Sequence, residues 1–142
     1  TIAHPPGFDL DLDDILAVQQ VAQQNGGSLH LTQDQASAVT GADAIYVKSW
    51  GAVRCFGQPD QEAALRAPHR DWKFGMAQLR RADPSAFVMH CLPVRRNVEI
   101  DEEILDGPQG AVVDQAENRL HVQRALLLSL LGDGAQRMKE LG

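Results

Sequence analysis

The sequence has few cysteines, no membrane-length apolar run and no recognisable leader. Among its 142 residues only Cys55 and Cys91 are cysteines, and their spacing is not that of a disulfide framework. No apolar run approaches the roughly 20 residues that a membrane helix needs. No charged, then apolar, then small-residue signal peptide follows Thr1. These absences argue against a disulfide-rich secreted domain and a membrane span, and they predict a protein of the reducing cytoplasm.

Patterns for nucleotides, metals and nucleic acids are missing as well. There is no Gly-x-Gly-x-x-Gly and no Walker sequence, which argues against a nucleotide enzyme. His4, Cys55, His90 and Cys91 lack any zinc-ligand spacing, so we expect no metal site. The formal net charge of −6 argues against a nucleic-acid surface, since such a surface needs a basic face.

Short apolar runs alternate with helical patterns along the chain. The strands are predicted at residues 1–4, 29–32, 44–47, 86–89 and 111–113. The helices are predicted near residues 9–25, 33–40, 58–65, 74–81, 101–105 and 118–131. This alternation predicts an α/β domain with a parallel sheet of about five strands, helices on both faces and right-handed crossovers.

Four aspartates crowd the start of the first predicted helix, at positions 9, 11, 13 and 14. Carboxylates there accept hydrogen bonds from free N–H groups and suit the helix dipole. A calcium loop would need a following Gly and Glu at fixed spacing, and neither is present. The aspartates therefore predict a helix cap.

The stretch His90–Asn97 concentrates side chains of catalytic type, with the sequence His-Cys-Leu-Pro-Val-Arg-Arg-Asn. It follows the predicted strand Ala86–Met89, and Pro93 disfavours regular structure there. Ligands of open α/β sheets bind at the carboxyl ends of strands, and guanidinium groups suit phosphate or carboxylate oxygens. Taken singly, each residue also has an ordinary role as a surface histidine, a buried thiol or a solvated arginine.

A second polar segment follows the predicted strand Ala44–Val47. Lys48, Ser49 and Trp50 come directly after it, at the same expected edge of the sheet. A lysine beside an aromatic residue in this place suits a carboxylate ligand, although a solvated surface lysine is the alternative. Two adjacent loops with cations predict one site for an anionic small molecule.

The stretch His90–Asn97 resembles the signature loop of the aspartate/ornithine carbamoyltransferase family. Its Val-Arg-Arg-Asn ending is most similar to the branch that acts on N-acylated ornithine, N-acetylornithine in particular. Three further segments match in family order over nearly the whole chain: Ala3–Phe8, Tyr46–Gly51 and Asp114–His121. The resemblance implies the Rossmann-like second domain of this family, which binds the amino-acid substrate.

The activity that this resemblance implies is carbamoyl transfer. The donor is carbamoyl phosphate and the acceptor is the side-chain amine of N-acetylornithine, in a step of arginine biosynthesis that needs no cofactor. Within the family, the alternatives are a domain acting on ornithine or on N-succinylornithine. A non-catalytic amino-acid-binding module derived from this fold is the alternative from another functional class.

Residue roles follow from the same resemblance. Cys91 and Leu92 are expected to line the carbamoyl group, and Arg119 to hold carbamoyl phosphate from the last helix. Lys48 and Leu92 are expected to contact the acylornithine, while Arg95 and Arg96 are possible substrate neighbours. An ion pair with a nearby acidic residue is the alternative for Arg119. The predicted substrate-binding set is Lys48, His90, Cys91, Leu92 and Arg119, of which Cys91 and Arg119 are the predicted catalytic residues.

The family has two domains and forms homotrimers. The Ser-x-Arg-Thr-type and His-Pro-x-Gln loops of its first domain do not occur in this sequence. The first strand and helix of its second domain are expected before Thr1. Residues 1–142 are therefore expected to form an acylornithine-binding domain that is incomplete at its N-terminus and inactive without a carbamoyl-phosphate domain.

Overall fold

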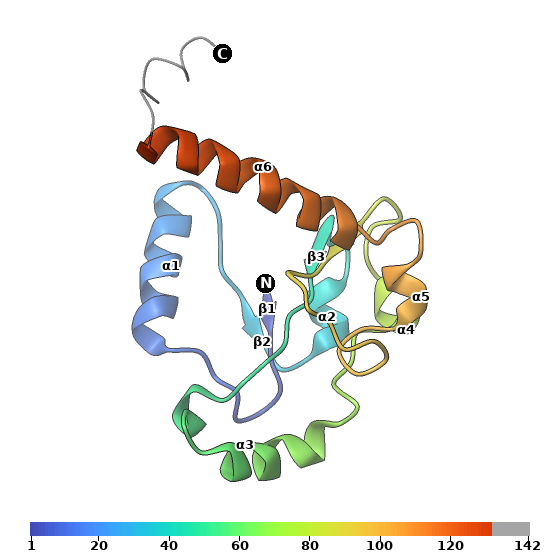
Figure 1. The fold of residues 1–142 in the computed structure, drawn as a ribbon. Coiled ribbons are helices and arrows are strands. Elements are labelled where there is room, and N and C mark those ends of the chain that lie inside the picture. The colour runs from blue at the N-terminus through green and yellow to red at the C-terminus, as the bar shows by residue number, and fades with distance from the viewer. Residues whose placement is uncertain (132–142) are drawn as a thin grey trace.

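The structure is a computed structural model that describes residues 1–131 (Figure 1). Its strands are β1 (Ile2–Ala3), β2 (Leu31–Thr32), β3 (Ala44–Tyr46) and β4 (Phe87–Met89). Its α-helices are α1 (Leu12–Gln24), α2 (Gln35–Val39), α3 (Pro59–Arg66), α4 (Met76–Leu79), α5 (Glu102–Leu105) and α6 (Val112–Leu131). Two 3-10 turns, η1 (Val53–Cys55) and η2 (Ala67–His69), flank α3. The predicted α/β class with parallel strands is confirmed.

The four strands form two separate parallel pairs. β1 pairs with β2, placing Ile2 opposite Leu31. β3 pairs with β4, placing Ile45 opposite Val88. Within residues 1–131, β1 and β3 are not paired with each other, so the prediction of one sheet of about five strands is wrong in that respect.

The predicted strand at residues 111–113 does not form. Ala111 does donate its N–H to the Val88 carbonyl at 2.8 Å, and Gly110 makes an isolated bridge to Val88. The chain then turns at once into α6, whose first residue, Val112, is buried. A short apolar run can be a buried strand or the first turn of a buried helix, and its periodicity does not distinguish them. The last helix therefore starts six residues before the predicted position 118.

The main core lies around the β3–β4 pair. Val88 and Ile100 are fully buried, and Ile45 packs with them. The other members come from the helices and loops around this pair: Val39, Phe74, Leu79, Ile104, Leu105 and Val112. This core fixes the carboxyl ends of β3 and β4, from which the two polar loops leave.

The cap predicted for the first helix is confirmed. The Asp11 side chain accepts hydrogen bonds from the N–H groups of Asp13 and Asp14, at 3.0 and 3.4 Å. Asp13 and Asp14 lie in the first turn of α1, where negative charge suits the helix dipole. Among residues 1–131, no helix is long and apolar enough to cross a membrane.

Candidate functional site

The loops after β3 and β4 bring Lys48 and Cys91 together. Because β3 and β4 are neighbouring parallel strands, both loops leave the same edge of the pair. The Lys48 Nζ lies 3.8 Å from the Cys91 Sγ, which accepts a weak hydrogen bond from it. Lys48 is exposed and Cys91 is half-buried, so solvent reaches both side chains. The loops that were predicted to share one site do meet.

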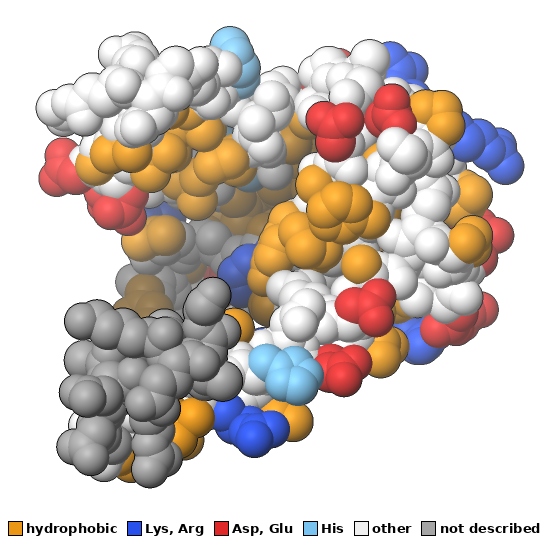
Figure 2. All heavy atoms as spheres, turned by 90° about the horizontal axis from the view of Figure 1, so that it is seen from above, with side chains coloured by type: hydrophobic (Ala, Val, Ile, Leu, Met, Phe, Trp, Pro, Cys, Tyr) orange, Lys and Arg blue, Asp and Glu red, His pale blue; other side chains and the backbone are white. Residues whose placement is uncertain are grey.

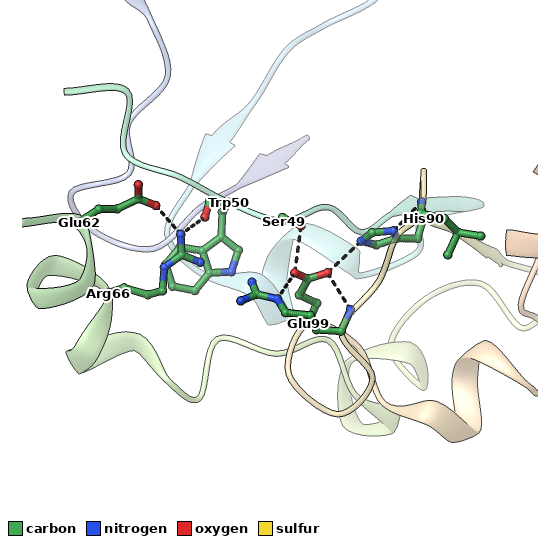
Figure 3. Close-up of polar contacts among 8 residues, drawn as sticks. Ser49, Trp50, Glu62, Arg66, His90 and Glu99 are labelled. Carbon is green, nitrogen blue, oxygen red and sulfur yellow. Dashed lines mark hydrogen bonds and ion pairs between the residues drawn. The ribbon is translucent and has the colours of Figure 1, made fainter. Parts of the chain in front are cut away.

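Glu99 lies behind these loops and binds both of them (Figure 3). Its Oε1 accepts hydrogen bonds from Ser49 Oγ at 2.9 Å and from Arg95 Nε at 2.8 Å. Its Oε2 lies 3.1 Å from His90 Nε2 and also accepts from the Arg95 N–H at 3.4 Å. We call Ser49, His90, Arg95 and Glu99 the Glu99 cluster. One carboxylate thus joins the loop after β3 to the loop after β4.

His90 faces the interior of this cluster. Its side chain is 1% exposed, and that of Glu99 is 4% exposed. The Leu92 N–H donates to His90 Nδ1 at 3.0 Å, so this nitrogen carries no proton. The proton of a neutral ring then lies on Nε2, which donates to Glu99. His90 therefore uses both ring nitrogens inside the protein and orients the backbone of Leu92, whose φ of 47° is unusual for a side chain of this size.

The charge of Glu99 is stabilised by its donors. Burial acts to raise the pKa of Glu99, but the hydrogen bonds from Arg95 and Ser49 outweigh burial. The net effect holds the pKa of Glu99 below its usual value. The carboxylate is thus ionised at neutral pH while its oxygens are occupied by protein donors.

This depressed pKa predicts how stability depends on pH. Ionised Glu99 stabilises the fold near pH 7, and that contribution is lost as the pH falls below about 4.3 and through the folded-state pKa. We expect the difference in unfolding free energy between the wild type and Glu99→Gln to shrink as the pH falls from about 7 to about 3. Urea unfolding across this range measures it, and a difference that stays constant with pH would contradict the assignment.

The two arginines of the Val-Arg-Arg-Asn ending are engaged within the protein. Arg96 makes a two-pronged ion pair with Asp106, at 2.6 and 2.8 Å. Arg95 donates its Nε to Glu99, although its side chain remains 58% exposed. Asn97 accepts the Glu102 N–H at 3.0 Å and so supports the start of α5. The Arg96 fork is therefore paired with Asp106 in this structure, and both side chains are exposed to solvent.

Arg119 lies apart from these groups, on the exposed surface of α6. The first turns of α6 are tied to the site through Gln115, which donates to the Tyr46 hydroxyl at 3.1 Å. Arg119 is one helical turn further and on the same side of the helix as Gln115. The structure thus places Arg119 on the helix that leads away from the end of β3, with no contact to Cys91 or Lys48 among the interactions of residues 1–131.

A second packed cluster holds Trp50 beside Lys48 and Ser49 (Figure 3). The Arg66 guanidinium lies over the Trp50 ring at 4.5 Å and donates to the Trp50 carbonyl at 2.6 Å. Phe8, from the loop after β1, meets the Trp50 ring edge-on at 4.5 Å. Arg66 also pairs with Glu62 on α3. The loop that carries Lys48, Ser49 and Trp50 is therefore packed against α3 and against the loop after β1.

Replacing Arg66 by glutamine is expected to loosen this attachment. The change removes a cation–π contact and a charged hydrogen bond from a partly exposed group, which together contribute about 1–2 kcal/mol. Urea unfolding of Arg66→Gln measures the loss, with Arg70→Gln as the matched exposed control on the same segment. Equal stability of both variants would show that Arg66 does not hold the loop.

The two loops border a hollow of about 620 Å³ between β1 and β3. Its polar lining includes Lys48 and Ser49 from the loop after β3, His4 from the loop after β1, and Glu99. Lys48 is the one Lys or Arg and Glu99 the one carboxylate among the described residues of this lining. In residues 1–131 no three His, Cys, Asp or Glu side chains are placed to hold a metal ion.

Glu99 and Arg66 were not among the site residues predicted from the sequence. Glu99 stands between Val98 and Ile100, and acidic residues are almost never fully buried unless paired, so the sequence gives no local signal for its burial. Nothing in the sequence near Arg66 distinguishes it from a solvated helix residue. Each also makes a contact that is distant along the chain, Glu99 with Ser49 and Arg66 with Trp50.

The sequence comparisons give the family. Residues 1–130 match the domain described as aspartate/ornithine carbamoyltransferase, Asp/Orn binding domain. The chain belongs to the aspartate/ornithine carbamoyltransferase family. It is 41% identical over 131 residues to the ornithine carbamoyltransferase of Mycolicibacterium smegmatis, covering 92% of this chain and 42% of that protein. It is 40% identical over 116 residues to the N-acetylornithine carbamoyltransferase of Xanthomonas campestris, covering 82% of this chain and 34% of that protein.

Solved structures of the family have the same fold. One is an acetylornithine transcarbamylase complexed with acetylcitrulline, with a TM-score of 0.83 and 35% identity. The match covers 91% of this chain and 39% of that one. An N-acetyl-L-ornithine transcarbamylase mutant complexed with carbamyl phosphate and N-succinyl-L-norvaline matches equally well, with a TM-score of 0.83. The chain spans about two fifths of the length of the relatives that it matches.

Proposed function

We propose that this chain is the acylornithine-binding part of a transferase that moves a carbamoyl group from carbamoyl phosphate to the side-chain amine of N-acetylornithine. The observation that carries the proposal is the charge pattern of the site. Lys48 lines the hollow and its ammonium lies beside Cys91, while the carboxylate of Glu99 is already occupied by Ser49, His90 and Arg95.

This pattern favours an acylated substrate over free ornithine. Both carry a carboxylate, which suits the Lys48 ammonium. Free ornithine also carries an α-ammonium, whose desolvation needs a carboxylate or several free acceptors. The one carboxylate in the described lining, Glu99, already accepts from four donors, whereas an acylated α-nitrogen is a neutral amide. Ornithine, the acceptor in the names of several relatives, remains the rival substrate.

The proposed reaction is a direct transfer. The deprotonated side-chain amine attacks the carbonyl carbon, a C–N bond forms, and the C–O bond to phosphate breaks. Donors placed at the carbonyl oxygen stabilise the tetrahedral intermediate, and binding both substrates together supplies much of the remaining acceleration. Lys48 is proposed to hold the acylornithine carboxylate, Cys91 and Leu92 to line the carbamoyl group, and Arg119 to bind carbamoyl phosphate. A second domain for carbamoyl phosphate and a trimer of such chains belong to the same proposal.

The experiment is an acetylcitrulline assay with carbamoyl phosphate and N-acetylornithine. The chain is tested alone, and as a chimera in which residues 1–130 replace the matching stretch of the X. campestris enzyme. Product from the chimera but not from the chain alone supports the proposal. A folded chimera that binds N-acetylornithine without turnover would favour a non-catalytic binding module, and turnover by the chain alone would refute the need for a second domain.

A further inference from the structure

Lys48 and Cys91 place an amine and a thiol side by side at the end of the β3–β4 pair. The Lys48 Nζ lies 3.8 Å from the Cys91 Sγ. Solvent reaches both side chains, because Lys48 is exposed and Cys91 is half-buried. The thiolate of a cysteine and the free amine of a lysine are both nucleophiles. A group that attaches to the sulfur is therefore delivered next to the nitrogen.

Backbone pairing holds the two side chains in this arrangement. The Val47 N–H donates to the Met89 carbonyl at 3.0 Å, one residue before Lys48 and two residues before Cys91. The Glu99 cluster joins the two loops that follow. A thiol and an amine that are fixed in this way react as parts of one molecule, which raises the rate of group transfer between them.

The amine of Lys48 is available for such a transfer. Among residues 1–131, none of the ion pairs includes Lys48. Lys73, in contrast, pairs with Asp101. An ammonium that is held by a carboxylate must lose both its proton and its partner before it can attack a carbonyl carbon. Lys48 has only to lose its proton, so we expect it to be the more reactive of these two lysines.

We propose that Lys48 is a self-modification site, at which a carbamoyl group taken up by the Cys91 sulfur passes to the Lys48 nitrogen. The donor is cyanate, a small electrophile that carbamoyl phosphate releases in water. The Cys91 thiol adds to the carbon of isocyanic acid and forms a thiocarbamate, while the thiol proton moves to the nitrogen. The deprotonated Lys48 amine then attacks the thiocarbamate carbon. A C–N bond forms, the C–S bond breaks, and an amine proton returns to the sulfur, which leaves a urea on Lys48 and a free Cys91 thiol.

The transfer changes the charge of the site. It runs toward nitrogen because nitrogen donates its lone pair to a carbonyl more strongly than sulfur does, which makes a urea more stable than a thiocarbamate. A urea is neutral, and Lys48 is the one Lys or Arg among the described residues that line the hollow. Figure 2 shows hydrophobic side chains on the walls of a hollow in this part of the molecule. A loss of acceptor binding on modification rests on the proposed function, whereas the modification itself depends on the contact between Lys48 and Cys91.

Peptide mapping by mass spectrometry on the full chain tests this proposal. The chain is incubated with potassium cyanate at mildly alkaline pH, and the carbamoylation of each lysine is followed with time. Lys48 should be modified at least about 10-fold faster than Lys73, because the neighbouring sulfur supplies the group in place. These readouts are masses, so they stand whether or not the chimera turns over N-acetylornithine.

Three variants make this result specific. Cys91→Ser should slow the modification of Lys48 about 10-fold, whereas Cys55→Ala, which removes the other, buried thiol, should leave that rate unchanged. Lys48→Arg lacks the acceptor amine, so the carbamoyl group should stay on Cys91, from which excess dithiothreitol removes it. In the wild type the group should resist dithiothreitol, because it lies on Lys48.

Three outcomes would overturn the proposal. The first is modification of Lys48 no faster than that of Lys73. The second is an unchanged rate at Lys48 in Cys91→Ser, since the sulfur would then take no part. The third is a wild-type chain whose Cys91 keeps the carbamoyl group while Lys48 remains unmodified, since no transfer would then occur across the contact.

Discussion

Replacing Glu99 by alanine is expected to lower the free energy of unfolding by about 3–5 kcal/mol, the range for breaking a buried charged cluster. The change leaves His90 buried without its partner at Nε2 and frees Ser49 and Arg95. It also uncouples the loop that carries Lys48 from the loop that carries Cys91. In the chimera with the X. campestris enzyme, a displacement of about 1 Å between these loops would reduce kcat about 100-fold.

Glu99 is a positioning residue in this account, so its substitution should change kcat more than KM. Glu103→Ala, on the exposed side of α5, is the matched control and should change neither stability nor kcat appreciably. Glu99→Gln keeps the shape of the side chain and removes its charge. Its stability and its kcat should therefore lie between those of Glu99→Ala and Glu103→Ala. If Glu99→Ala were as stable and active as Glu103→Ala, the loops after β3 and β4 would not depend on the Glu99 cluster.

Replacing Lys48 by methionine is expected to raise KM for N-acetylornithine about 10- to 100-fold in the chimera. The expected loss is that of one charged hydrogen bond to a substrate carboxylate, about 1.5–3 kcal/mol. Lys48 is exposed and keeps no partner other than Cys91 in the interactions described for residues 1–131, so its removal should leave stability nearly unchanged.

A variant that keeps the positive charge at position 48 distinguishes a role in substrate binding from a role in folding. Lys48→Arg keeps the cation and should recover much of the affinity for N-acetylornithine. KM for carbamoyl phosphate should stay close to that of the unmodified chimera in both variants. If Lys48→Met raised KM for carbamoyl phosphate and left that for N-acetylornithine unchanged, the role proposed for Lys48 would be wrong.

The sequence allowed most of the elements that carry the site to be predicted. The strands before Lys48 and before His90 were located because apolar runs end there at polar or proline-containing loops. Their parallel pairing followed from the helices between them, and it brought Lys48 to Cys91. The cap at Asp11 was predicted because its chemistry is local to one helix turn.

The remaining features depend on contacts that local patterns do not encode. Ala111 and Val112 form a strand-like contact and a helix start within two residues, and an apolar run cannot reveal that change. The guanidinium of Arg96 was considered a possible substrate neighbour, yet Asp106, ten residues away, occupies it. Glu99 gained its role from Ser49, fifty residues earlier in the chain. The predicted end of the last helix at residues 132–134 lies outside the described residues.

The most direct test of the account is substrate preference in two chimeras. Residues 1–130 are placed in the X. campestris N-acetylornithine enzyme and in the M. smegmatis ornithine enzyme, and kcat/KM is measured for N-acetylornithine and for ornithine. The account predicts that both chimeras favour N-acetylornithine, because the charge pattern around Lys48 and Glu99 comes from this chain. A preference for ornithine in both chimeras would contradict it.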